Sequence, residues 1–294
     1  MARIPVLKTY KIFIGGQFPR TESGRYYPLC NAAGRTIANV CLSSRKDVRN
    51  AVVAARGAFA DWSARAAFNR GQILYSMAEM LETRRAQFVE ELNQQGITQK
   101  AASDEVSASV DRWVHYAGWC DKYQALFGTV NPVASSHFNF SVPEPTGVVG
   151  IFAPEESGLL GLVSLLAPAL AGGNTVVAVA SESKPLCAVT LAEVMHASDT
   201  PAGVVNILTG KRSELLPHLT AHMDVNAVVF GGHNTKEWQE IQGLAPGNVK
   251  RVVQQWNKNW NDSAAQSPYH ILDTQEIKTT WHPIERITPS GSKY

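Results

Sequence analysis

The stretch IFAPEESGLLGLVSLLAPALAGGNTVVAVASESKP, residues 151–185, decides the fold. A buried strand, GVVGIFAP at 147–154, precedes an apolar helical run, and the Gly-rich turn of AGGNTVVAVA then leads into a β-branched strand. Strand, helix and strand in this order predict parallel neighbours joined by a right-handed crossover helix. The stretch therefore indicates a parallel sheet.

The same alternation continues toward residue 258. We expect further helices and strands at 184–198, 203–210, 215–220, 226–232 and near Trp238. This pattern is typical of a doubly wound, Rossmann-like α/β domain. Ligands of such domains lie beyond the carboxyl ends of the strands, which predicts a site formed by the loops at 153–158, 180–184, 209–211 and 231–235.

The N-terminal part has a different pattern, in which a short strand pair is followed by long amphipathic helices. The segment KIFIGGQF at 11–18 predicts a strand pair around a Gly-Gly turn. Apolar residues at helical spacing predict amphipathic helices over 43–62, with a Ser at the N-cap, and over 69–96.

Composition excludes several classes of protein. A net charge of +2, from scattered Lys and Arg, offers no basic stripe for nucleic acid. The four cysteines form no CxxC pair, so neither a metal site nor a disulfide framework is indicated. No apolar run reaches the length of a membrane helix, so we expect no membrane contact and a cytoplasmic location.

About the first 255 residues resemble the aldehyde dehydrogenase superfamily. The resemblance rests on ordered segments that include YKIFIGGQF, NAAGRTIANV, EPTGVVGIFAP, LAPALAGGNTVV and PAGVVNILTG. It implies that residues 1–125 and 146–258 form the cofactor-type α/β domain of that family. Function must still be argued from the site.

The resemblance places altered residues at both catalytic positions of the cofactor domain. The family's Asn, which binds the oxyanion, falls at Glu156, and the family's general-base Glu falls at Gln255. A carboxylate offers no hydrogen-bond donor to an oxyanion, and Gln cannot accept a proton. We therefore expect no catalytic residue here.

The cofactor markers are also incomplete. The ribose-binding Lys of Lys-Pro-Ser-Glu is absent from Val179–Glu182, where only Ser181 and Glu182 match. The family motif Phe-Thr-Gly-Ser, which caps a helix under the cofactor pyrophosphate, corresponds to Phe230–His233. Gly232 and His233 are therefore the remaining candidates for cofactor binding at this position. A helix N-terminus there could still attract an anion. We expect no bound cofactor, with weak NAD(P) binding as the alternative.

The family's catalytic domain, with its nucleophilic Cys, has no counterpart after Gln255, where about forty residues follow. HILDTQEIKTTWHPIE at 270–285 resembles the family's C-terminal strand, and SSHFNFSVPEPTGVVG at 135–150 resembles the hairpin that pairs with it. We predict an oligomerisation element at 126–145 and 265–285, and a polar tail at 286–294. Loss of the catalytic domain also predicts uncovered apolar surface on the remaining domain.

Three local features allow a second interpretation. Cys187 could be a nucleophile, but a buried structural thiol is favoured. His218 and His222, at i and i+4, could bind a metal, but surface histidines are favoured because no third ligand is evident. Glu155 and Glu156 could form an acid/base pair, but a solvated acidic loop is favoured.

The chain resembles the truncated, non-catalytic C-terminal domain of the two-domain, family-16-like aldehyde dehydrogenases. This predicts an inactive structural or regulatory subunit that assembles with a full-length active aldehyde dehydrogenase or with itself. One alternative is a residual NAD or nucleotide sensor. Another is an oxidoreductase whose site a partner subunit completes.

Overall fold

A computed structural model describes residues 6–256 and 259–284. At its centre is a five-stranded parallel sheet with strand order β10-β9-β6-β7-β8. The strands are β6 (Val148–Phe152), β7 (Thr175–Val179), β8 (Val205–Leu208), β9 (Ala227–Phe230) and β10 (Arg251–Gln254). The predicted doubly wound α/β architecture is confirmed. Within the described ranges, no helix has both the length and the apolar content needed to cross a membrane.

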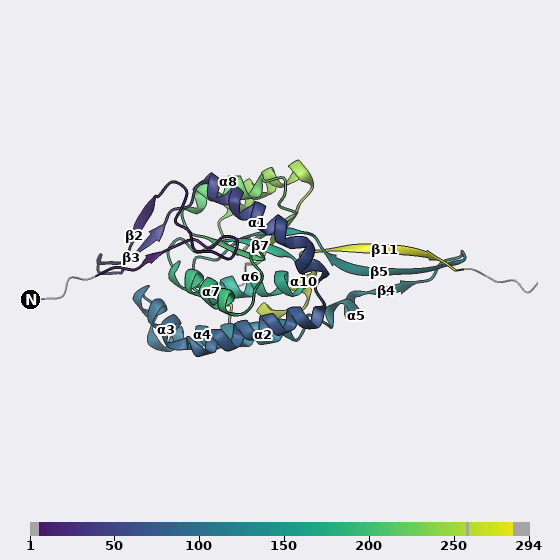
Figure 1. The fold of residues 1–294 in the computed structure, drawn as a ribbon, viewed down its shortest axis with the longest axis horizontal. Helices are drawn as coiled ribbons and strands as arrows, with labels where there is room; N and C mark the ends of the chain where they lie inside the picture. The colour runs from purple at the N-terminus through teal and green to yellow at the C-terminus, as the bar shows by residue number, and fades with distance from the viewer. Residues whose placement is uncertain (1–5, 257–258, 285–294) are drawn as a thin grey trace, which may run out of the picture.

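Helices cover both faces of this sheet (Figure 1), which explains why β6, β7, β8 and β9 are buried along their whole length. On one face lie α1 (Arg45–Ala64), α8 (Arg212–Thr220) and α9 (Thr235–Leu244). On the other face lie α2 (Ala67–Thr83), α3 (Arg85–Gln94), α4 (Gln99–Ala117), α6 (Leu160–Ala171) and α7 (Leu186–Ala197).

The N-terminal predictions hold in part. Ser44 begins α1, and its backbone N–H donates to Asp47 Oδ2 at 2.7 Å. The helix expected over 69–96 is interrupted at Arg84, between α2 and α3. The Gly-Gly turn joins a single bridge, Ile14 to Gln17. A small sheet of β1 (Thr9–Tyr10), β3 (Thr36–Cys41) and β2 (Tyr26–Cys30) lies nearby.

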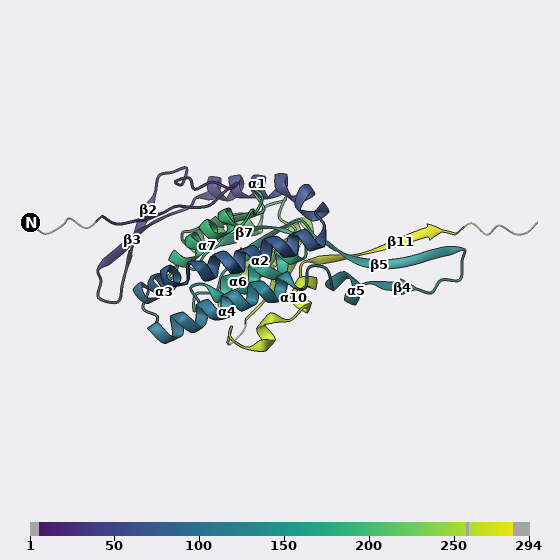
Figure 2. The ribbon, with the colours of Figure 1, turned by 60° about the horizontal axis from the view of Figure 1, so that its bottom comes forward.

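A third sheet, fully antiparallel, projects from the body as an arm (Figures 1 and 2). It has the order β11-β5-β4, with β4 (Thr129–Asn131), β5 (His137–Pro145) and β11 (Gln275–Pro283), and α5 (Tyr123–Phe127) leads into it. Its role in assembly, and the division of the chain at 126–145 and 265–285, stay predictions. The polar tail predicted at 286–294 lies outside the described residues.

Asn174 joins the arm to the body and is fully buried. Its Oδ1 accepts the N–H of Gly147 at 3.0 Å, just before β6. Its Nδ2 donates to the carbonyl oxygens of Thr274 at 3.0 Å and Ala169 at 3.3 Å. One amide side chain thus fixes the start of β6, the end of α6 and the start of β11.

We expect Asn174→Ala to lower the free energy of unfolding by about 2–4 kcal/mol, because it leaves several buried backbone groups without partners. Urea denaturation measures this, with the exposed Asn50→Ala on α1 as the matched control. A loss no larger than that of the control would show that the junction does not depend on this amide.

Candidate functional site

The predicted site residues gather at the carboxyl edge of the five-stranded sheet. Because β6 pairs in parallel with both β7 and β9, the strand order reverses at β6, and a crevice is expected between the loops after β6 and β9. The structure brings to this edge Glu155, Glu156, Ser181, Glu182, Gly232 and His233, and places Gln255 directly after β10.

Glu155, in the loop after β6, extends its carboxylate into the turn after β7. Oε2 accepts hydrogen bonds from Ser181 Oγ at 2.8 Å and from the Ser183 N–H and Oγ at 3.1 and 3.0 Å. Oε1 accepts the Glu182 N–H at 3.0 Å. The turn after β7 is therefore bound to a carboxylate of the same chain.

Arg212 completes this network from the first residue of α8. Its buried guanidinium donates to Glu155 Oε1 at 2.7 Å, to Glu237 Oε2 at 3.1 Å and to the carbonyl oxygen of Ala153. Sequence reasoning missed Arg212. The available signal was a cationic residue directly after the predicted loop at 209–211, at the carboxyl end of a strand.

Burial alone would raise the pKa of Glu155, but the N–H groups of Glu182 and Ser183 and the charge of Arg212 outweigh it, so that this pKa is lowered. Glu155 is thus held ionised. The expectation of a solvated acidic loop is wrong for Glu155, because the neighbouring turn supplies donors that sequence spacing does not reveal.

Glu156 points away from Glu155, toward β9 and the end of the chain. Its Oε1 accepts the indole N–H of Trp260 at 3.0 Å and lies 3.7 Å from His233 Nε2. The position at which the resemblance implies an oxyanion donor therefore holds an acceptor that is already engaged.

Gln255, at the expected general-base position, is buried and makes contacts within the chain. Its Nε2 donates to Asp273 Oδ2 at 2.9 Å and lies 3.2 Å from His270 Nδ1. The side chain therefore anchors the segment before β11. Asn257 and Lys258, which follow it, lie outside the described residues.

A closing segment, residues 259–272, folds back against α4 and α6 and contains η2 (Ser263–Gln266) and α10 (Tyr269–Leu272). Buried Arg112 of α4 donates to the carbonyl oxygens of Trp260 at 2.8 Å and Ala265 at 2.6 Å, and to Ser164 Oγ at 2.5 Å. Trp260 and Ile271 are themselves buried. The sequence predicted uncovered apolar surface where the family's catalytic domain would lie. The closing segment covers part of the apolar surface on the side of α4 and α6.

The residues at this edge do not fit a dinucleotide. The resemblance places Val179 where the family has its ribose-binding Lys, and the turn after β7 is occupied by Glu155. The start of α9 is also closed, because Asn234 Oδ1 accepts the N–H groups of Lys236 at 3.0 Å and Glu237 at 3.4 Å. The free helix N-terminus expected near Gly232 and His233 is thus capped by a neighbouring side chain.

The remaining alternatives find no support in the geometry. Cys187 is fully buried, and burial raises the pKa of its thiol well above the ordinary value. The helix α8 ends at Thr220, so His218 and His222 do not share a helical face. Among the residues that the structure describes, no three His, Cys, Asp or Glu side chains cluster as metal ligands.

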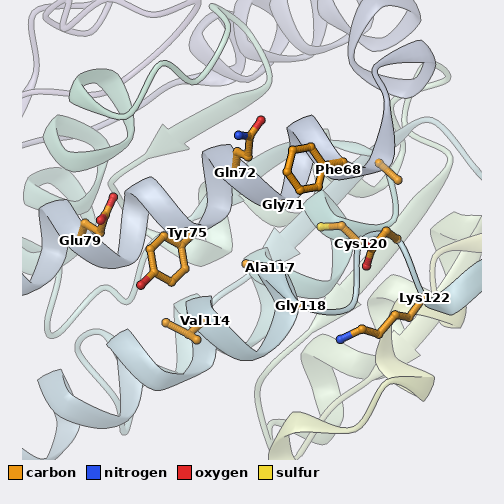
Figure 3. Close-up of a pocket in the computed structure, with 12 residues that line it drawn as sticks. Phe68, Gly71, Gln72, Tyr75, Glu79, Val114, Ala117, Gly118, Cys120 and Lys122 are labelled. Carbon is orange, nitrogen blue, oxygen red and sulfur yellow. The ribbon is translucent and has the colours of Figure 1, made fainter.

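An open groove of about 570 Å³ lies elsewhere, between α2 and α4 (Figure 3). Phe68 and Tyr75 form one wall and Val114 the other, with Cys120 near one end. Burial raises the pKa of Cys120 to about 12, so its thiol is not a nucleophile at neutral pH. None of the candidate site residues named from the sequence lines this groove.

A family model described as the aldehyde dehydrogenase family matches residues 19–256. The chain belongs to the aldehyde dehydrogenase family. It is 33% identical over 249 residues to the cytosolic 10-formyltetrahydrofolate dehydrogenase of Xenopus tropicalis, covering 83% of this chain and 28% of that relative. It is 34% identical over 254 residues to the mouse retinal dehydrogenase 2, covering 84% of this chain and 48% of that relative.

Solved structures of the family share the fold. The NAD+ complex of an aldehyde dehydrogenase from Bacillus cereus superposes with a TM-score of 0.80 at 29% identity, covering 84% of this chain and 50% of that one. The chain therefore spans about half the length, or less, of the relatives it matches.

We expect Arg112→Ala to release the closing segment and to lower the free energy of unfolding by about 2–3 kcal/mol, since buried carbonyl groups lose a charged donor. Amides of residues 259–272 should then exchange hydrogen about tenfold faster or more, while those of β6 remain protected. Ser164→Ala, which removes one of the three bonds, is the control. Unchanged exchange in Arg112→Ala would contradict this anchoring.

The lowered pKa of Glu155 predicts a pH-dependent contribution to stability. This contribution is complete above the unfolded value of about 4.3 and is lost as the pH falls through the lower folded value. Glu155→Gln should cost about 1 kcal/mol at neutral pH, and its difference from wild type should shrink below about pH 4. Urea denaturation across pH tests this, with Glu90→Gln as a control for net charge. A pH-independent difference would count against an ionised Glu155.

Proposed function

We propose that this protein is a catalytically inactive aldehyde dehydrogenase-like subunit. It acts as a structural or regulatory partner of a full-length, active aldehyde dehydrogenase. In this proposal it corresponds to the truncated, non-catalytic domain of the two-domain, family-16-like enzymes. A cytoplasmic location is part of the proposal and agrees with the relative named cytosolic.

The loss of catalysis is argued from two side chains and one connection. Glu156 presents an acceptor where an oxyanion needs a donor, and Gln255 replaces a base with an amide. Between β10 and β11, the described part of residues 255–274 holds only η2 and α10, which leaves no room for a second α/β domain. No step of aldehyde oxidation can be assigned to these residues.

The arm carries the argument for assembly. Val130 and Phe138 are 68% and 45% exposed, and they lie on one face of the β4-β5 pair together with Phe140 and Val142. On β11, Ile277 and Trp281 are 58% and 57% exposed. Apolar side chains on both faces of a projecting sheet with an open edge strand favour contact with another chain.

A nucleotide sensor and a site completed by a partner are less well supported. The donors that would receive a nucleotide already bind Glu155 and Asn234, and Glu156 and Gln255 are bound within the chain. A subunit that assembles but does not catalyse does not use these donors or the side chains of Glu156 and Gln255, so the proposed function is compatible with their internal contacts.

Purification of the tagged protein from its native host, followed by native mass spectrometry, tests the proposal. We expect a full-length aldehyde dehydrogenase at fixed stoichiometry, because the arm has apolar surface that a second chain can bury. The double variant Val130→Asp, Phe138→Asp should be recovered folded but alone. The matched control Phe68→Asp, at an exposed Phe on α2, should assemble like wild type.

Three results would contradict the proposal. One is recovery of the wild-type chain without an aldehyde dehydrogenase, and another is an equal loss of assembly in both charge variants. The third is turnover of an aldehyde with NAD+ by the isolated chain, which would show that Glu156 and Gln255 do not abolish the chemistry.

A further inference from the structure

The donors around Glu155 are held in place by contacts that do not involve Glu155. The N–H of Lys184 donates to Ser181 Oγ at 3.0 Å, which shapes the turn after β7. Arg212 is fixed by the Ala153 carbonyl oxygen and by Glu237, with its own N–H bound to Glu182 Oε2 at 3.2 Å. The turn 181–183 and Arg212 therefore form a receptor that exists apart from the carboxylate inside it.

The shape of this receptor matches a planar anion with two oxygens. One oxygen of Glu155 takes the Glu182 N–H and Arg212, and the other takes the donors of Ser181 and Ser183. Such charge-assisted hydrogen bonding to both oxygens suits a carboxylate.

The surrounding charges limit the ligand to a single negative charge. The cations are Arg212 and Lys184, whose Nζ donates to the Glu155 carbonyl oxygen at 2.8 Å. Two further carboxylates lie beside Arg212, because Glu237 accepts from its guanidinium and Glu182 accepts its backbone N–H. A dianion such as a phosphate group would be repelled where a monoanion is accepted.

We propose that the turn 181–183 and Arg212 form a carboxylate receptor that the chain fills with its own Glu155. This internal ligand occupies the edge of the sheet where the family's dinucleotide would otherwise lie. A nucleotide bound as in the family would have to displace Glu155 and place its ribose beside the carboxylates of Glu182 and Glu237. The inference goes beyond the proposed function, because it holds whether or not the chain assembles.

Removal of the internal ligand tests the receptor directly. Glu155→Ala excises a fragment of the size of acetate and leaves every donor in place. We expect its Tm to fall by about 2–6 °C, and about 0.2 M acetate to recover roughly half of that loss relative to equal chloride. The wild-type Tm under the same salts is subtracted, because salts stabilise proteins generally.

The adjacent Glu156→Ala is the matched control, since its carboxylate takes a single hydrogen bond, from Trp260. It should show no acetate-specific rise in Tm. Equal effects of acetate and chloride on Glu155→Ala, or an equal acetate response in Glu156→Ala, would overturn the receptor. A larger gain from sulfate than from acetate would overturn its preference for a monoanion.

A second measurement applies to the wild-type protein and does not depend on the folding of Glu155→Ala. The protein is labelled with ¹³C at its Glu carboxyl groups, and the resonance of Glu155 is assigned by its absence in Glu155→Gln. That resonance should titrate below the range of exposed glutamates and should not respond to added acetate. An ordinary titration would show that the receptor does not hold Glu155.

Discussion

The parallel pairing of β6 with β7 on one side and β9 on the other determines which loops the residues after β6 can contact. The chain leaves β6 between two loops, and the consecutive residues Glu155 and Glu156 point to opposite sides. Glu155 reaches the turn after β7, while Glu156 reaches His233 and Trp260. Two neighbouring carboxylates thus act on two separate parts of one crevice.

The crevice at the carboxyl edge of a parallel sheet presents polar groups that a ligand could contact. Such groups are satisfied by water, by a ligand or by side chains of the same chain. Here Glu155 satisfies the turn after β7, Asn234 satisfies the start of α9, and Glu237 pairs with Arg212. These three side chains therefore occupy groups at the carboxyl edge that a ligand could otherwise contact.

The strands β6, β7, β8 and β9 could be predicted from the sequence because β-branched runs alternate with helical runs at regular spacing, and the parallel pairing of β6, β7 and β8 follows from that order. The internal contacts could not be predicted. Arg212 lies 57 residues from Glu155, and Arg112 lies 148 residues from Trp260. Neither pair leaves a local pattern, because only the folded sheet and the closing segment bring them together. For the same reason, the adjacent residues Glu155 and Glu156 suggested a solvated acidic loop.

The body and the arm differ in how the chain covers their apolar side chains. In the body, Trp260 and Ile271 cover apolar surface, and the carboxyl edge is filled by side chains of the same chain. In the arm, Val130, Phe138 and Trp281 remain exposed on strands that stand away from that core. Burial of such side chains is favourable by roughly 25 cal/mol per Å² of apolar area. In the assembly that we propose, burial of these arm side chains favours contact with the partner, and this contact does not depend on a ligand at the carboxyl edge of the sheet.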